Sequence, residues 1–156
     1  MGSSHADQRG LSARAMSASG VLVGACALAL SGCTPSSVMN LSVGDCMQLP
    51  TDSTAVTIDR SSCTSPHQAE VAAVINVQSD ADAAFPGNAA LNSQAETACV
   101  ESFEDYVGAA YVSSSLDVTW LTPTAESWQR GDRSIVCLVH AMGSAELTAS
   151  VKGSGL

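Results

Sequence analysis

The chain has 156 residues, of which 46% are hydrophobic, 13% charged and 4% aromatic, a composition typical of one folded domain rather than of a disordered segment. Six Lys and Arg stand against fifteen Asp and Glu, and the formal net charge of -9 opposes binding to phosphate backbones. We therefore expect no nucleic-acid partner.

The N-terminal segment has the organisation of an export signal. Arg9 and Arg14 precede an apolar run of about ten residues, which matches a secretory h-region and is too short to span a bilayer. Leu30-Ser31-Gly32-Cys33 follows and resembles the lipobox of bacterial lipoproteins, in which the cysteine is thioether-linked to diacylglycerol and the preceding peptide is removed. The resemblance implies a signal peptide at residues 1–32 and lipidation of Cys33. The alternative is an ordinary signal peptide with a chance cysteine.

Cleavage before Cys33 would remove 32 of the 156 residues and leave 124, with four Lys and Arg against fourteen Asp and Glu and a formal charge of -10. Two or three acyl chains, such as palmitate, each contribute roughly 0.8 kcal/mol per buried methylene. We therefore expect a protein anchored to the extracytoplasmic face of the cell membrane without spanning it. The polar composition of residues 34–40 predicts a flexible tether behind the lipidated cysteine, and residues 41–156 are predicted to form the folded domain.

The cysteines of the mature domain indicate disulfides. Their spacing contains no CxxC pair, so we predict no metal site and no cofactor, and an oxidising compartment favours pairing. These cysteines are Cys46, Cys63, Cys99 and Cys137. Four cysteines allow three pairings. We favour Cys46 with Cys63, which flank a predicted hairpin, and Cys99 with Cys137, which would join a helix to a strand.

The first half of the domain reads as strands followed by a helix. Residues 41–49 and 55–58 are predicted strands joined by a polar turn at residues 50–54, and residues 70–77 form a longer, β-branched strand. A loop at residues 80–88 would end with Asn88 as the helix N-cap. A helix is expected over residues 89–107, because apolar residues recur at four-residue steps and Gly108 can end it. The apolar positions are Leu91, Ala95, Cys99, Phe103 and Val107.

The second half shows the two-residue alternation of strands. It predicts strands at residues 116–121 and 133–140 and a half-exposed strand at residues 145–152. The order of elements favours an α+β fold, with a mostly antiparallel sheet, one long helix packed on it and two disulfides.

Several short motifs together resemble a known family. They are Val43-Gly44-Asp45-Cys46, the stretch CTSPHQAEV at residues 63–71, Phe85-Pro86-Gly87, the Cys99 helix ending in Tyr106-Val107-Gly108, Pro123-Thr124, Ser127-Trp128, Gly131-Asp132-Arg133 and Cys137. In order and separation they are similar to the septum-formation domain of actinobacterial lipoproteins and membrane proteins. The resemblance covers roughly residues 41–155. It implies a place at the membrane and a link with division, and it carries over no catalytic residues.

Two groups of residues are candidate binding sites. His67 and Glu70 could form a metal or acid/base pair at the start of a strand, although side chains three apart point to opposite faces of a regular strand, and a structural pair is the alternative. The second group lies in a predicted loop at residues 127–133, where an aromatic ring stands among charges that suit an interface or a sugar. Packing of that ring within the domain is the alternative. The members of this loop group are Trp128, Arg130, Asp132 and Arg133.

The first hypothesis for function is a lipid-anchored binding or scaffold domain of the cell envelope, linked to septum formation and contacting envelope or division proteins. The second is an envelope enzyme or a carrier of a hydrophobic ligand, with a pocket lined by residues such as Leu91, Phe103 and Trp120. A purely structural lipoprotein is the third. No G-x-S-x-G, S-x-x-K or H-E-x-x-H motif is present, so we name no catalytic residue.

Overall fold

The computed structural model describes residues 36–51, 57–143 and 145–156. The predicted signal peptide and Cys33 lie outside these residues, as do most of the predicted turn at residues 50–54 and the beginning of the predicted strand at residues 55–58. Among the residues described, no helix has both the length and the apolar character needed to cross a membrane.

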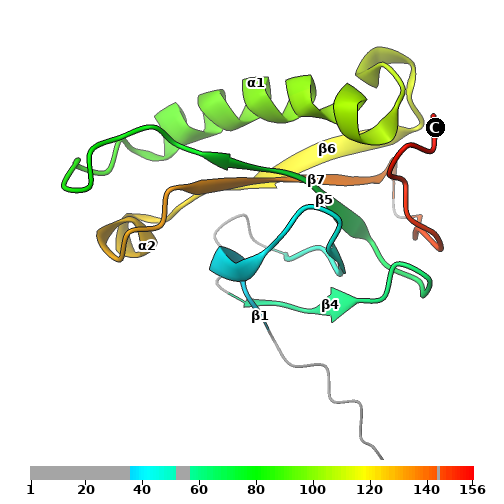
Figure 1. The fold of residues 1–156 in the computed structure, drawn as a ribbon, viewed down its shortest axis with the longest axis horizontal. Coiled ribbons are helices and arrows are strands. Elements are labelled where there is room, and N and C mark those ends of the chain that lie inside the picture. The colour runs from blue at the N-terminus through cyan, green and yellow to red at the C-terminus, as the bar shows by residue number, and fades with distance from the viewer. Residues whose placement is uncertain (1–35, 52–56, 144) are drawn as a thin grey trace, which may run out of the picture. The chain divides into compact units, whose positions relative to one another are not determined.

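A five-stranded antiparallel sheet forms the centre of the fold, in the order β4-β2-β5-β7-β6 (Figure 1). Its strands are β2 (Cys46–Met47), β4 (Arg60–Ser61), β5 (Ala69–Asn76), β6 (Leu116–Leu121) and β7 (Ser134–Ala141). The interior strand β7 buries five consecutive residues, because both of its faces are covered. The predicted strands at residues 70–77, 116–121 and 133–140 are therefore confirmed to within one residue at each end.

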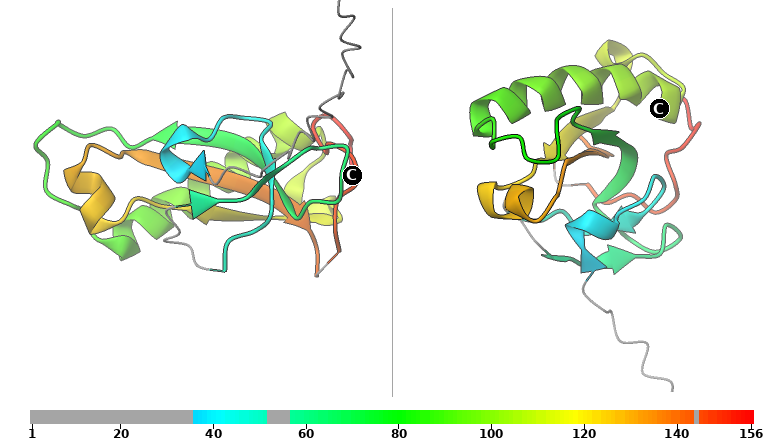
Figure 2. Two further views of the ribbon diagram at one scale, coloured as in Figure 1. Left: turned by 90° about the horizontal axis from the view of Figure 1, so that it is seen from below. Right: turned by 60° about the vertical axis from the view of Figure 1, so that its left-hand side comes forward.

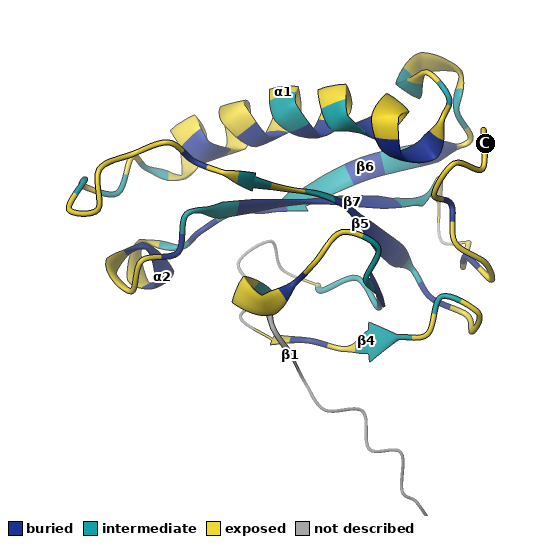
Figure 3. Ribbon diagram, viewed as in Figure 1, coloured by how far each residue is buried: buried dark blue, intermediate teal, exposed yellow. Residues whose placement is uncertain are grey.

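The long helix α1 (Asn88–Val107) packs on one face of the sheet (Figures 1 and 2). Its buried side follows the predicted apolar stripe, and its outer side is exposed (Figure 3). Gly108 ends the helix at a φ of 82°, which a residue without a Cβ adopts at little cost. The N-cap is Gly87 and not Asn88, because Gly87 turns the chain at a φ of 92° and Asn88 is already helical.

A smaller layer covers the other face of the sheet (Figure 2). In it, β1 (Ser36–Ser37) pairs with β3 (Thr57–Ile58), and the short 3-10 helix η1 (Val38–Asn40) follows β1 directly. Leu41 and Ile58 from this layer join a second hydrophobic core with residues of β5, β6 and β7. Within the tether expected at residues 34–40, residues 36–40 instead form paired and helical structure, and residues 34–35 lie outside the described residues.

The predicted strand at residues 41–49 is wrong over most of its length, since only Cys46–Met47 is extended and paired. The chain turns before it, where the Ser42 N–H donates to Asp45 Oδ2 at 2.8 Å and Gly44 has a φ of 93°. β2 then pairs with β4, whereas the described part of the predicted strand at residues 55–58 pairs with β1. The expected hairpin between those two strands therefore does not form.

Both favoured disulfide pairings are confirmed. Cys46 and Cys63 are joined beside the β2–β4 pair, with their Cα atoms 5.3 Å apart. Cys99 and Cys137 join α1 to β7 across the core, at 5.2 Å. In the chain-entropy model the two closed loops stabilise the fold by roughly 3 and 4 kcal/mol.

Besides η1, two further short helices were not predicted. η2 (Tyr111–Ser113) follows α1, and α2 (Ala125–Gln129) occupies part of the expected loop at residues 127–133. A reciprocal capping box starts α2, because the Thr124 hydroxyl accepts from the Ser127 N–H at 3.0 Å and the Ser127 hydroxyl accepts from the Thr124 N–H at 2.9 Å.

Candidate functional site

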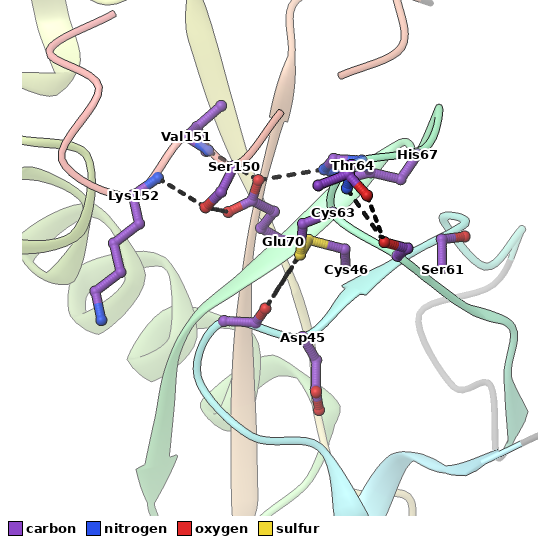
Figure 4. Close-up of a disulfide and its surroundings, with 12 residues drawn as sticks. Asp45, Cys46, Ser61, Cys63, Thr64, His67, Glu70, Ser150, Val151 and Lys152 are labelled. Atoms are coloured by element: carbon purple, nitrogen blue, oxygen red, sulfur yellow. Dashed lines mark hydrogen bonds and ion pairs between the residues drawn. A yellow bond between two sulfur atoms is a disulfide. The ribbon is translucent and has the colours of Figure 1, made fainter. Parts of the chain in front are cut away.

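Glu70, the second residue of β5, carries a carboxylate with no exposed surface. Its Oε1 accepts from the Val151 N–H at 2.8 Å, and its Oε2 accepts from the Tyr106 hydroxyl at 2.8 Å and from the Ser150 hydroxyl at 2.9 Å. His67 approaches Oε1 through Nε2 at 3.2 Å. In Figure 4, Ser150 and Val151 lie on one side of Glu70 and His67 on the other. We call these five residues the Glu70 network, and through it one carboxylate joins β5, α1, the turn before β5 and the C-terminal segment.

The protonation of His67 follows from its contacts. Its Nδ1 lies 2.9 Å from the carbonyl oxygen of Ser65, and because a carbonyl only accepts, Nδ1 carries a hydrogen. Nε2 faces a carboxylate oxygen of Glu70, so one proton must lie between these two atoms. The Glu70 carboxylate accepts three further hydrogen bonds, so the His67–Glu70 contact is one part of a buried, fully engaged polar group.

The expectation that His67 and Glu70 point to opposite faces is wrong. β5 begins at Ala69, so His67 lies in the turn before the regular strand, where the two-residue alternation does not apply. The chain there makes an isolated bridge to Leu147 instead: the His67 N–H donates to the Leu147 carbonyl at 2.9 Å, and the Leu147 N–H donates to the His67 carbonyl at 2.8 Å.

The predicted strand at residues 145–152 is also wrong. In the described part of that segment, Leu147 and Val151 are buried, but the only ladder contact is the bridge at Leu147. The Val151 N–H donates to Glu70 rather than to a neighbouring strand. Beyond it, the Gly153 and Gly155 N–H groups donate to the last carbonyls of α1, at 2.8 and 2.9 Å. The segment is held by a side chain and by the C-terminal end of a helix, which two-residue alternation cannot predict.

Burial raises the pKa of Tyr106 above its ordinary value, and the hydrogen bond to Glu70 and the charge of Glu70 raise it further, while the hydrogen bond to Ser150 acts in the opposite direction. Tyr106 therefore remains a neutral donor at physiological pH. It was not among the sequence candidates, although its position beside the apolar stripe of α1 indicated that its hydroxyl would need a buried partner.

Ligand atoms of Cys46, His67 and Glu70 lie within 4.8 Å of one another, an arrangement of residue types that zinc uses. The structure shows why these residues do not fit a metal ion. The Cys46 sulfur is bonded to Cys63 and cannot act as a thiolate, and both carboxylate oxygens of Glu70 already accept hydrogen bonds. The cluster therefore stabilises the fold in its oxidised form and is not an open coordination site.

Trp128 and Arg133 from the second candidate group meet at a corner that holds the loop between β5 and α1. Trp128 is 4% exposed, and its indole N–H donates to the Ala83 carbonyl at 2.7 Å. The Arg133 guanidinium carbon lies 3.8 Å from the centre of the Trp128 ring, and its Nη2 donates to the Ala81 carbonyl at 3.1 Å. Nε of Arg133 also donates to the Ser79 hydroxyl at 3.1 Å. We call this arrangement the Trp128 corner, in which the ring and the cation already have partners within the domain.

The other two members of that group differ. The Asp132 carboxylate is buried and accepts from the Ser134 N–H at 3.0 Å, which shapes the entry into β7. Arg130 is exposed and makes a surface ion pair with Glu126 at 2.6 Å. Of the candidate binding residues, Arg130 is thus the one whose charge faces solvent most openly, and a binding role for this group stays a prediction.

Comparison with known proteins identifies the family. The family model described as septum formation matches residues 37–155. The chain belongs to the septum-formation family. The match covers both disulfides, the Glu70 network and the Trp128 corner, and it confirms the resemblance to a septum-formation domain. The curated proteins contain no match to the chain, and neither do the solved structures.

The septum-formation domain also has surface hollows. One of about 350 Å³ lies between the start of α1 and the loop at residues 77–86, and it touches Leu91 and Trp128. Another of about 240 Å³ touches Trp120 and Leu49. Neither includes Phe103, which is fully buried and packs edge-to-face on Tyr111. The three residues expected to line a ligand pocket therefore do not share either hollow.

A polar pair at the edge strand was likewise missing from the sequence candidates. The Tyr111 hydroxyl donates to Asp117 Oδ1 at 2.6 Å. This bond raises the pKa of Tyr111 and lowers that of Asp117. The two residues are six positions apart and lie in different elements, so no periodic pattern connects them.

Proposed function

We propose that this septum-formation domain is a binding or scaffold module anchored by lipid to the extracytoplasmic face of the cell membrane, where it serves septum formation by contacting envelope or division proteins. Family membership supports the link with septum formation. The finer statements, on the anchor, the compartment and the mode of action, are part of the proposal.

The main support for this proposal is the way in which the cysteines are used. The two disulfides use all four cysteines that follow Cys33, and disulfides persist in oxidising compartments outside the cytoplasm. Cys33 itself stands in a lipobox-like sequence and has no cysteine of the domain left to pair with. An exported, oxidised domain behind a lipidated cysteine accounts for both facts.

The Glu70 network supports a scaffold rather than a reaction centre. A catalytic carboxylate must reach its substrate, whereas Glu70 and His67 have no exposed surface and their polar atoms are engaged within the domain. A domain fixed in this way presents a rigid surface to a partner.

Cell fractionation and imaging test the proposal. The full chain should be found in the membrane fraction and concentrate at division sites, and Cys33→Ala should release it. A Cys63→Ala and Cys46→Ala double variant controls for effects of folding, because it keeps Cys33. Cys33→Ala retained in the membrane fraction would contradict the anchor, and a uniform distribution of the anchored protein would contradict the septal role.

A further inference from the structure

The distance from the lipidation site to the fold is short. β1 begins at Ser36, three positions after Cys33, so the two Cα atoms can lie no more than about 11 Å apart in any conformation. We propose that this short connection seats one end of the domain directly on the bilayer surface and turns α1 away from it. The inference rests on the lipid anchor of the proposed function. We call this end the anchor-proximal end and define it as β1, η1 and residues 41–45.

The dimensions of the bilayer keep the start of the domain close to the membrane surface. Acyl chains attached at Cys33 enter the hydrocarbon layer, and the headgroup region outside that layer is about 5–7 Å thick on each side. A reach of about 11 Å then carries Ser36 only about 5 Å beyond the headgroups. η1 follows β1 without a gap, so its side chains start within reach of the lipid headgroups.

The anchor-proximal end has the chemistry for this position. Met39 in η1 is 48% exposed and Val43 is 51% exposed, and apolar side chains at this depth can enter the boundary between headgroups and acyl chains. The end is also held firmly to the sheet. Arg60 of β4 donates to the Asn40 carbonyl at 2.6 Å and pairs with Asp45 at 3.1 Å.

The distribution of charge favours the same orientation. α1 lies on the far side of the sheet from η1 (Figures 1 and 2). It exposes four carboxylates and contains no Lys or Arg, so an anionic membrane surface repels it. These carboxylates belong to Glu96, Glu101, Glu104 and Asp105. By contrast, the Asp45 carboxylate at the anchor-proximal end is neutralised by Arg60.

Photo-cross-linking to lipid tests the orientation in the full, processed chain. The photoreactive residue p-benzoylphenylalanine is placed at Met39, with Val43 as a second site. The matched control is Val112 in η2, an apolar residue that is 95% exposed and follows the end of α1. We expect phospholipid adducts at positions 39 and 43 and no adducts at position 112.

A longer connection gives an independent reading. Insertion of about ten Gly and Ser residues between Pro35 and Ser36 adds a root-mean-square reach of about 17 Å, so adducts at position 39 should decrease while the protein stays in the membrane fraction. Equal adducts at positions 39 and 112, or none at positions 39 and 43 in an anchored protein, would overturn the orientation alone. Cys33→Ala that remains in the membrane fraction would instead overturn the proposed function on which the orientation rests.

Discussion

The Glu70 network and the Trp128 corner have the same structural role but use different chemistry. Each fastens an irregular segment to the sheet, the C-terminal segment in one case and the loop before α1 in the other. The network relies on a charge with no exposed surface, whereas the corner relies on a buried but neutral indole and on a partly exposed guanidinium. Removing one partner of a buried charge costs more stability than removing a partner of a neutral donor or of a partly exposed cation, so the two regions should differ in their sensitivity to substitution.

The largest effect is expected from Glu70→Gln. The amide keeps the volume but places an NH₂ group against donors and leaves His67 without its anionic partner, which should cost about 3–5 kcal/mol in the free energy of unfolding. Chemical denaturation of the domain measures this loss in the free energy of unfolding. The matched control is Glu146→Gln, an exposed carboxylate of the same C-terminal segment, and similar losses in the two variants would refute the role of burial.

Tyr106→Phe should reduce stability by about 1.5–3 kcal/mol, because it removes a hydroxyl donor to a charged group. It also has a pH signature. Since the pKa of Tyr106 is raised in the folded state, its stabilising contribution is complete below the unfolded value of about 10 and decreases as the pH rises above it. Tyr106→Phe should flatten this alkaline loss more than Tyr111→Phe does. If the slope of stability against pH in the alkaline range were unchanged in Tyr106→Phe, the hydrogen bond from Tyr106 to Glu70 would not contribute to stability.

Trp128→Phe tests the corner without removing its aromatic packing. It leaves the Ala83 carbonyl without its donor, and we expect a loss of about 1–2 kcal/mol by thermal or chemical denaturation. Trp120→Phe is the control, because its indole N–H donates to Asn92 at an exposed position and water can replace that bond. If Trp120→Phe destabilised the domain more, the comparison between buried and exposed donors would fail.

The smallest effect is expected from Arg130→Gln, below about 0.5 kcal/mol, because its ion pair with Glu126 is formed by exposed side chains. Arg133→Gln, three positions further on, should cost about 1–3 kcal/mol, since it breaks bonds to Ala81 and Ser79. A large loss of stability in Arg130→Gln would contradict the prediction that an exposed ion pair contributes little.

The elements with a regular period were predictable from the sequence. α1 and the strands β5, β6 and β7 have apolar patterns that match the helical or two-residue period, and the Cys99–Cys137 pair follows from them. The Cys46–Cys63 pair is confirmed although the hairpin from which it was predicted does not form. The errors fall where side chains replace the backbone ladder. Val151 alternates like a strand residue but bonds to a carboxylate, and residues 41–45 turn around Asp45. The partners of Glu70 lie up to 81 residues away, and no local pattern reports such a distance.

The candidate site was only partly predictable for the same reason. His67 and Glu70 stood out as a candidate metal or acid/base pair at the start of a strand, with a structural pair as the alternative. Their mutual contact depends on the turn before β5, and the contribution of Tyr106 depends on how α1 lies on the sheet. The sequence thus identified His67 and Glu70 as a pair but did not predict the other partners of Glu70.

Proximity labelling in intact cells tests the proposed scaffold role most directly. The labelling enzyme is fused to the full chain, and the Cys33→Ala form, which the proposal expects to be released from the membrane, is the control. The account predicts that division or wall-synthesis proteins are enriched beside the anchored form and not beside the released one. Equal neighbours for both forms, or none specific to the anchored form, would contradict a scaffold that works at the membrane.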